Sequence, residues 1–198
     1  MTVREILQIG DPLLRQRSYK ITRFDESLST LVDDMVETMH AKHGVGLAAP
    51  QIGVRKRVIV VQMPDDDGYP HPGELFVMCN PEIVKASREV EADQEGCLSV
   101  VGYIGDVERA TWVIVRGQDV HGRKVQVKAH GFLARAFQHE ISHINGVLYV
   151  DIAEQDSVIT VEEFERRLRE QQEQEEQQAE ASAEEGSDAE SRDETTAA

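Results

Sequence analysis

The sequence predicts an α+β fold. The strand-like segments lie together between residues 58 and 128, and the two strongest helical periods lie outside that stretch, at residues 25–43 and 131–145. A parallel sheet would need helices that alternate with the strands, and this order does not provide them. About 170 residues of ordinary composition can bury one core, so we expect a single catalytic domain over residues 1–169.

The acidic excess of the chain is concentrated in its last part. The formal net charge is −16, and residues 170–198 carry 11 acidic residues against one basic residue. This segment offers no apolar face to bury, so we expect a disordered acidic tail. Residues 1–169 lack the basic footprint of a nucleic-acid-binding domain, and no direct nucleic-acid binding is expected.

Composition also favours a cytoplasmic protein without membrane contact. No apolar run approaches the roughly 18–20 residues of a membrane span. The N-terminal residues lack the charged and apolar segments of a secretory signal. Two cysteines are too few for a disulfide scaffold, so each thiol is free to be a ligand or a nucleophile.

The N-terminal part predicts an irregular start followed by a helix. Ile9-Gly10-Asp11-Pro12 is a turn signal. Asp25 can cap a helix, which we expect to end near His43 with Gly44 as its left-handed terminator. The apolar residues of this helix follow the period of one buried face: Leu28, Leu31, Val32, Met35, Val36 and Met39.

Strands are predicted after a glycine-rich stretch at residues 44–53. Asn80-Pro81 should end the second strand, because proline cannot donate a ladder hydrogen bond. His121-Gly122 favours a tight turn into the last strand. The predicted strands are Val58–Gln62, Leu75–Cys79, Arg88–Asp93, Val107–Asp119 and Lys124–Lys128.

Two helices follow the strands. The first spans residues 131–145 and ends at Asn145-Gly146. Its apolar line is Leu133, Phe137, Ile141 and Ile144. The second starts at a capping box formed by Thr160 and Glu163, and we expect it to fray beyond Leu168. Its docking face would be Val161, Phe164 and Leu168.

The sharpest chemical feature is the run His139-Glu140-Ile141-Ser142-His143. Residues four apart lie above one another on a helix, so both imidazoles can share one metal ion. Glu140 is close enough to act on a metal-bound water without being a ligand. Short patterns also recur by chance, so a surface helix with two incidental histidines is the alternative.

The third metal ligand is open on the residues alone. Tyr149 stands where one zinc peptidase class requires a further histidine. Glu163 lies 20 residues after His143, the spacing of another class, although it serves better as the capping partner of Thr160. Cys97 lies in a turn-prone stretch, and a thiolate suits a divalent metal beside two imidazoles. Cys79, among apolar residues, is predicted to be buried core.

Three motifs in order carry a family resemblance. They are Gly44-Val-Gly-Leu-Ala-Ala-Pro-Gln51, Glu95-Gly-Cys-Leu-Ser99 and Gln138-His-Glu-Ile-Ser-His143. With this spacing, the chain resembles peptide deformylases over residues 9–151. The resemblance implies antiparallel sheets packed around a central HExxH helix, with an N-terminal helix and a C-terminal helix.

The resemblance also implies roles for single residues. The metal ligands would be Cys97, His139 and His143. Glu140 would carry the proton, and Gln51 with the backbone N–H of Leu98 would hold the developing oxyanion. Val45 and Gly46 would line the peptide cleft and pair with the substrate backbone, and Glu95 would form an ion pair with Arg109. The helix turns before His139 also present Phe132, Arg135 and Ala136, and Phe132 is either a wall of a methionine pocket or core packing.

By this resemblance the protein removes the formyl group from the N-terminal formylmethionine of newly made polypeptides. A metal-bound hydroxide attacks, Glu140 acts as general base and then acid, and formate leaves. The cofactor would be one divalent metal ion, Fe(II) physiologically, although the same ligands accept Zn(II), Ni(II) or Co(II). The partner would be the nascent formylmethionyl polypeptide, and a transient ribosome contact stays open.

Two departures and two alternatives accompany this prediction. Val101 stands where proline is common in the family and Ser142 where aspartate is frequent, which bears on metal preference and rate. A zinc endopeptidase with Glu163 as ligand is one alternative. A non-catalytic protein with a structural metal, or with an interacting acidic tail, is the other, although a structural metal would need neither Glu140 nor Gln51.

Overall fold

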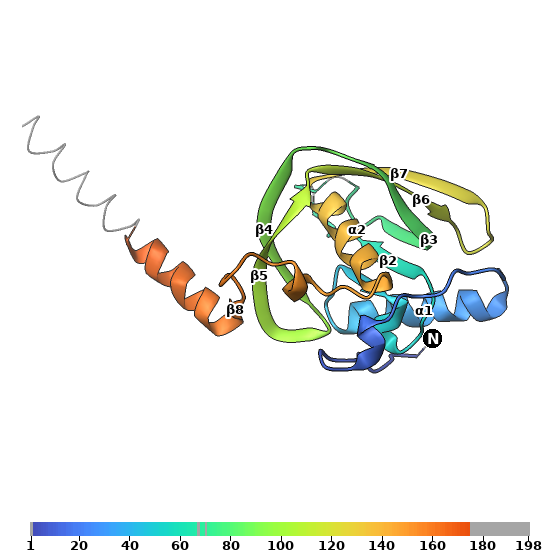
Figure 1. Ribbon diagram of the computed structural model, residues 1–198, viewed down its shortest axis with the longest axis horizontal. Helices are drawn as coiled ribbons and strands as arrows, with labels where there is room; N and C mark the ends of the chain where they lie inside the picture. Colours follow the sequence, from blue (N-terminus) through green and yellow to red (C-terminus); the bar gives the residue numbers. More distant parts are fainter. Residues whose placement is uncertain (1, 67, 70, 175–198) are drawn as a thin grey trace, which may run out of the picture. The chain divides into compact units, whose positions relative to one another are not determined.

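Antiparallel strands and α-helices build the fold, as the sequence predicts (Figure 1). The structure is a computed structural model that describes residues 2–66, 68–69 and 71–174. The chain divides into one compact unit that ends at Val158 and a second unit that begins at Ile159. The predicted α+β class, with a central HExxH helix and helices near both ends, is confirmed.

The first unit contains a five-stranded sheet and a hairpin. The sheet has the order β1-β2-β3-β6-β7, with β1 at one edge. Its strands are β1 Gly46–Ala48, β2 Val58–Gln62, β3 Leu75–Ala86, β6 Trp112–Gln118 and β7 Lys124–His130. The hairpin pairs β4, Val90–Cys97, with β5, Val100–Ala110.

Two α-helices, α1 (Glu26–Ala41) and α2 (Gly131–Ile144), pack on opposite faces of the sheet. Successive strand residues point to opposite faces. In β2, Ile59 and Val61 accordingly join the core cluster of α2, whereas Val58 and Val60 join that of α1. Short 3-10 helices lie at Pro12–Arg15, Ala49–Ile52 and Tyr149–Asp151. Figure 1 shows α2 between the sheet and the β4–β5 hairpin, so the polar side chains of α2 lie between these two layers.

The caps of α1 show one correct and one wrong prediction. Asp25 caps the helix, and its carboxylate accepts a hydrogen bond from Ser27 N at 3.1 Å. His43, with φ 54°, rather than Gly44 takes the left-handed conformation after the helix. Gly44 meets a different requirement, because a Cβ there would lie 2.7 Å from Leu98 Cδ1.

Two predicted strand boundaries are wrong. β3 continues through Asn80-Pro81 to Ala86, because a register shift between Cys79 and Glu82 accommodates the proline. The stretch predicted as one strand at 107–119 is two strands, β5 and β6, that separate at Thr111. Each half belongs to a different sheet, and no local signal marks that exchange.

The second unit begins with β8, Ile159–Thr160, and residues 161–174 are helical. Glu163 N donates to Thr160 Oγ1 at 3.1 Å, as half of the predicted capping box. The helix continues past Leu168, where fraying was expected. Residues 170–174, the start of the predicted disordered tail, are helical. The rest of the tail, from residue 175, lies outside the described residues, so its disorder stays a prediction. Within the described ranges, no helix is long and apolar enough to cross a membrane.

Candidate active site

The fold brings three potential metal ligands together. The ligand atoms of Cys97, His139 and His143 lie within 4.8 Å of one another. His143 Nε2 is 3.2 Å from Cys97 Sγ and also 3.2 Å from His139 Nε2. The histidines are one turn apart on α2, and Cys97 is the last residue of β4. Residues far apart in the sequence thus point their donor atoms at one place.

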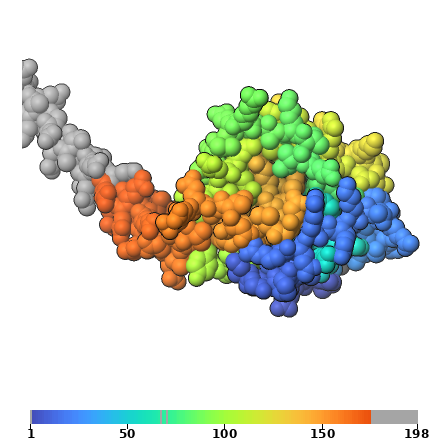
Figure 2. Space-filling model, viewed as in Figure 1, coloured from blue at the N-terminus to red at the C-terminus, as the bar shows by residue number. Residues whose placement is uncertain are grey.

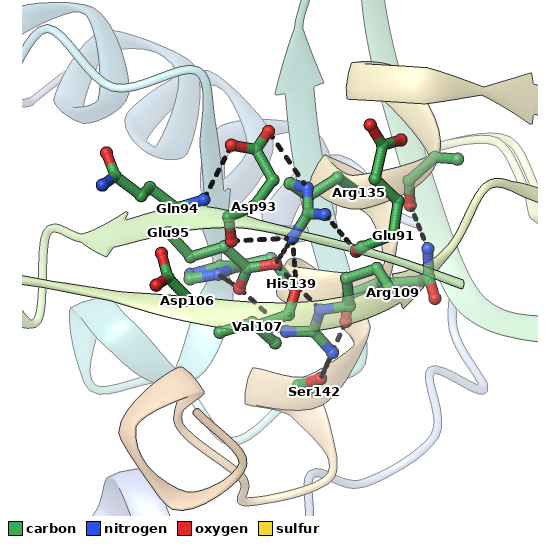
Figure 3. Close-up of polar contacts among 12 residues, drawn as sticks. Glu91, Asp93, Gln94, Glu95, Asp106, Val107, Arg109, Arg135, His139 and Ser142 are labelled. Carbon is green, nitrogen blue, oxygen red and sulfur yellow. Dashed lines mark hydrogen bonds and ion pairs between the residues drawn. The ribbon is translucent and has the colours of Figure 1, made fainter. Parts of the chain in front are cut away.

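Glu95 fixes the orientation of the His139 ring (Figure 3). His139 Nδ1 lies 2.9 Å from Glu95 Oε2, so Nε2 turns toward Cys97 and His143. Arg109 donates to both Glu95 oxygens at 2.9 Å, which is the ion pair that the resemblance implied. Burial acts to raise the pKa of Glu95, but hydrogen bonds from Arg109 and His139 lower it to about 2. Glu95 is therefore a carboxylate at neutral pH.

The pKa values of the two histidines shift in opposite directions. Burial, together with the neighbouring His139 charge, lowers the pKa of His143 well below its usual value. Burial also acts to lower the pKa of His139, but hydrogen bonds with Cys97 and Glu95 raise it to about 10. His143 is therefore neutral at pH 7 and offers a nitrogen lone pair to a cation.

Glu140 lies beside this cluster, against β1. A Cβ on Gly46 would lie only 2.4 Å from Glu140 Oε1, so the carboxylate occupies the space that Gly46 leaves. Burial raises the pKa of Glu140 to about 7, against the opposing charge of His139. Glu140 Oε2 is buried and has no hydrogen-bond partner among the described residues. Such a carboxyl group can take up and return a proton near pH 7.

Gln51 is held with its amide nitrogen toward the cysteine. Its Oε1 accepts from Ala48 N at 2.8 Å, and its Nε2 donates to Ser99 Oγ at 3.2 Å and lies 3.5 Å from Cys97 Sγ. Leu98 follows Cys97 in the turn of the hairpin, and its carbonyl accepts from Gln8 Nε2 at 3.1 Å. The structure thus brings Gln51 and Leu98 to the cluster.

The three residues predicted to bind substrate, Val45, Gly46 and Phe132, lie in different surroundings. Val45 is 39% exposed, and its carbonyl accepts from Gln62 N at 2.9 Å. Gly46 lies in the edge strand next to Glu140. Phe132 lies two turns before His139 on α2, and its partly exposed ring forms a T-shaped pair with the ring of Tyr69 at a centroid distance of 5.4 Å.

Sequence reasoning missed the supporting roles of three polar residues, Gln138, Ser99 and Arg135. The side-chain amide of Gln138 accepts a hydrogen bond from Ala110 N and donates one to Ala110 O, both at 3.0 Å. The buried Ser99 hydroxyl accepts a hydrogen bond from Gln51. Arg135, considered above as a wall position, directs its guanidinium to the β4–β5 hairpin. The available signal was a long polar side chain one turn before His139, on a helix rich in apolar residues.

The cluster fits a divalent transition metal. One thiolate and two imidazoles are the donors that zinc, iron(II), nickel and cobalt accept, and three protein ligands leave a coordination position open. Among the residues that the structure describes, Glu163 is not in the cluster. Its carboxylate instead accepts from Arg166 and Arg167. Within the first unit, the geometry brings Cys97 to the two imidazoles as a third donor.

Relatives of this chain were found by sequence. The family model described as "Polypeptide deformylase" matches residues 3–158. A peptide deformylase of Halothermothrix orenii is 47% identical over 151 residues, which cover 76% of this chain and 94% of the relative. One of Thermomicrobium roseum is 46% identical over 162 residues, covering 80% and 90%.

Solved structures of peptide deformylases are also similar to this chain. Peptide deformylase from Ehrlichia chaffeensis in complex with actinonin superposes with a TM-score of 0.74 at 41% identity, covering 78% of this chain and 91% of that one. The Met-Ala-Ser-bound class I type b enzyme from Acinetobacter baumannii gives 0.72 at 38% identity, covering 76% and 98%. The chain therefore belongs to the polypeptide deformylase family and is a hydrolase.

Proposed function

We propose that this protein removes the formyl group from the N-terminal formylmethionine of newly made polypeptides in the cytoplasm, and releases formate. One observation carries the proposal. Glu140, whose pKa is about 7, lies against Gly46 of the edge strand and interacts electrostatically with His139 of the Cys97–His139–His143 cluster. A proton carrier beside a metal-ligating cluster and an open strand edge is what hydrolysis of a peptide's terminal amide requires.

Cys97, His139 and His143 would hold one divalent metal ion. Fe(II) is the physiological candidate, and Zn(II), Ni(II) and Co(II) fit the same donors. When bound, the ion supplies a Lewis acid that makes water nucleophilic at neutral pH. Glu95 would accept from His139 Nδ1 and so leave Nε2 to hold the ion once Nε2 has given up its proton.

Glu140 moves the proton. Its carboxylate takes a proton from the attacking water and returns it to the departing amine. Gln51 Nε2, already oriented by Ala48 and Ser99, would donate to the oxyanion together with the Leu98 N–H. Each donor would contribute about 3 kcal/mol to transition-state stabilisation if it acts as oxyanion-hole donors commonly do.

The edge strand β1 would bind the substrate backbone. The carbonyl of Val45 is turned toward β2, where it accepts from Gln62 N. Successive residues of an antiparallel strand alternate in this respect, so Gly46 faces the open edge and can pair with an extended peptide. Phe132 would border the pocket for the methionine side chain.

The test is formate release from a formyl-Met peptide by metal-stripped protein reloaded with each metal in turn. We expect Glu140→Gln to keep the metal and to lose about 10²- to 10⁴-fold in rate, because only the proton carrier is removed. Cys97→Ala should lose the metal. Undiminished deformylation by Glu140→Gln would refute the mechanism, and metal loss in Glu163→Ala but not in Cys97→Ala would favour a zinc endopeptidase.

A further inference from the structure

The three ligating side chains come from two elements, so their spacing depends on how α2 is held against the hairpin. His139 and His143 belong to α2, and Cys97 ends β4. Gln138 hydrogen-bonds to Ala110 of β5, so it connects α2 to only one strand of the hairpin. Arg135 is the α2 residue whose side chain bonds both strands of the hairpin.

The Arg135 guanidinium is bound to backbone oxygens of both strands (Figure 3). Its Nη1 donates to Val107 O at 2.7 Å and to Asp93 O at 3.2 Å, and these two residues form one cross-strand pair. Its Nη2 donates to Glu91 O at 2.7 Å. Arg135 is 8% exposed, so these bonds are shielded from water. A planar fork of donors is suited to such a fixed array of acceptors.

Arg135 also contacts the carboxylate that orients His139. Its Nη1 donates to Glu95 Oε1 at 3.1 Å, while His139 Nδ1 lies 2.9 Å from Glu95 Oε2. Arg135 and His139 are four residues apart on α2, so both side chains leave the same face of the helix. One guanidinium thus fixes both the hairpin that carries Cys97 and the carboxylate that aims His139.

We propose that Arg135 is a positioning residue of the metal centre. It sets the distance from the Cys97 sulfur to the two imidazoles, and it touches none of the reacting atoms. The inference depends on the proposed function only in that Cys97, His139 and His143 hold a metal ion. Loss of the guanidinium should therefore weaken the hold on the metal beyond any general loss of stability.

The experiment uses Co²⁺ as the probe, bound to the metal-stripped full-length protein. Arg135→Met keeps an unbranched stem without donors, and Arg135→Lys keeps the charge but cannot bond both Glu91 O and Val107 O. Arg57→Met is the matched control. Arg57 is 5% exposed and donates to Asn145 Oδ1 at 2.9 Å and to Pro81 O at 3.0 Å, so it ties the C-terminal end of α2 to β3 rather than to the hairpin.

The thiolate-to-cobalt absorption band and the rate of Co²⁺ loss to excess chelator are measured for each protein. We expect Arg135→Met to lose Co²⁺ about 10- to 100-fold faster with an altered band, as for other groups that orient metal ligands. Arg135→Lys should be intermediate. Arg57→Met should have a lower Tm but the wild-type band and rate.

Wild-type rates in the Arg135 variants, or equal acceleration in Arg57→Met, would overturn the proposal. If Arg135→Met does not fold, the comparison of Arg135→Lys with wild type decides. Formate release is not part of this comparison, so a protein that binds Co²⁺ but does not deformylate refutes the proposed function alone. A wild-type protein that binds no Co²⁺ refutes both.

Discussion

At the scale of single residues, Gly46 sets the room available to Glu140. A Cβ at this position would lie 2.4 Å from Glu140 Oε1 and 2.9 Å from its Cδ, so any side chain here would force the Glu140 carboxylate to move. The backbone of Gly46 does not adopt a positive φ, so alanine meets no conformational barrier there. The requirement for glycine therefore comes from the neighbouring carboxylate.

We expect Gly46→Ala to fold and to keep its metal, while kcat for formate release falls about 100-fold, the effect of misplacing a reacting group by about 1 Å. Metal content and formate release measure the two effects. In a Glu140→Gln background the same change should cost little more, because both substitutions then act on one group. Additive losses in the double variant would contradict this coupling.

Cys79 and Cys97 differ in environment more than in sequence. Cys79 is fully buried in β3 and packs in the α1 core cluster, as predicted, whereas Cys97 is partly exposed. Burial raises the pKa of the Cys79 thiol from 9.0 to about 11, with a further contribution from Asp119. This thiol therefore stays protonated in the native protein over a range in which the unfolded chain ionises.

The sign of the resulting pH effect is given by linkage. As pH rises from 9.0 to about 11, the unfolded state loses the Cys79 proton and the native state does not, so Cys79 contributes less to stability. We expect the difference in free energy of unfolding between wild type and Cys79→Ala to be constant below pH 8 and to shrink across this window. Urea denaturation at several pH values measures it, and a constant difference would contradict the shift.

At the scale of elements, Asn80 explains how β3 accommodates Pro81. Asn80 has φ 52°. Its side chain accepts from Ile21 N at 2.7 Å and donates to Ile21 O and Gln118 Oε1, both at 2.9 Å. These bonds hold the strand at the register shift, and asparagine tolerates the left-handed conformation better than most residues.

Asn80→Ala should lower the free energy of unfolding by about 3 kcal/mol, since three hydrogen bonds are lost and alanine is strained at this φ. Asn80→Gly loses the same bonds without that strain, so its loss should be about 1 kcal/mol smaller. Urea denaturation of both variants gives the comparison. A glycine variant less stable than the alanine variant would show that the backbone conformation is not the cause.

Elements with a local signal could be predicted from the sequence. The period of Leu133, Phe137 and Ile141 identified α2, and Asn145-Gly146 marked its end correctly. β4 and β5 were recognised only in part, because the predicted strands stopped at Asp93 and resumed at Val107, whereas β4 continues through Gly96, a residue type disfavoured in strands, to Cys97. That strand is held by cross-strand pairing, which leaves no mark on one strand alone.

The site residues also divide into those that the sequence predicts and those that only the fold reveals. Three motifs named the cluster and Glu140, because those residues stand next to one another or at fixed spacing in the sequence. The partners of Arg135 could not be predicted, because they are backbone carbonyls of Glu91, Asp93 and Val107. A carbonyl oxygen is common to all residues, so only the fold identifies which ones a guanidinium meets.

At the scale of the whole molecule, the acidic tail lies outside the family match. The family model covers residues 3–158, and the tail begins at residue 170. Figure 2 shows, within the first unit, the chain around and after α2 (orange) between the β4–β5 hairpin (green) and the N-terminal segment (blue). All the proposed site residues belong to this unit.

A chain that ends at Arg169 should keep kcat and KM for a formyl-Met peptide within about twofold, because a tail without an apolar face has nothing to contribute to the site. Steady-state formate release by the full-length and shortened proteins tests this. The shortened protein is also the reference for any role of the tail in solubility. A tenfold loss of kcat/KM would assign the tail to the enzyme.

The edge position of β1 has a consequence for the range of substrates. A strand that pairs with a peptide through N–H and C=O groups reads features that all residues share, whereas side chains on the peptide project away from those bonds. With such pairing, selection would concern mainly the formylated first residue and would depend little on the side chains that follow it. If β1 binds the substrate as proposed, one protein could process chains of unrelated sequence, because β1 lies at the edge of the sheet and would pair with the backbone.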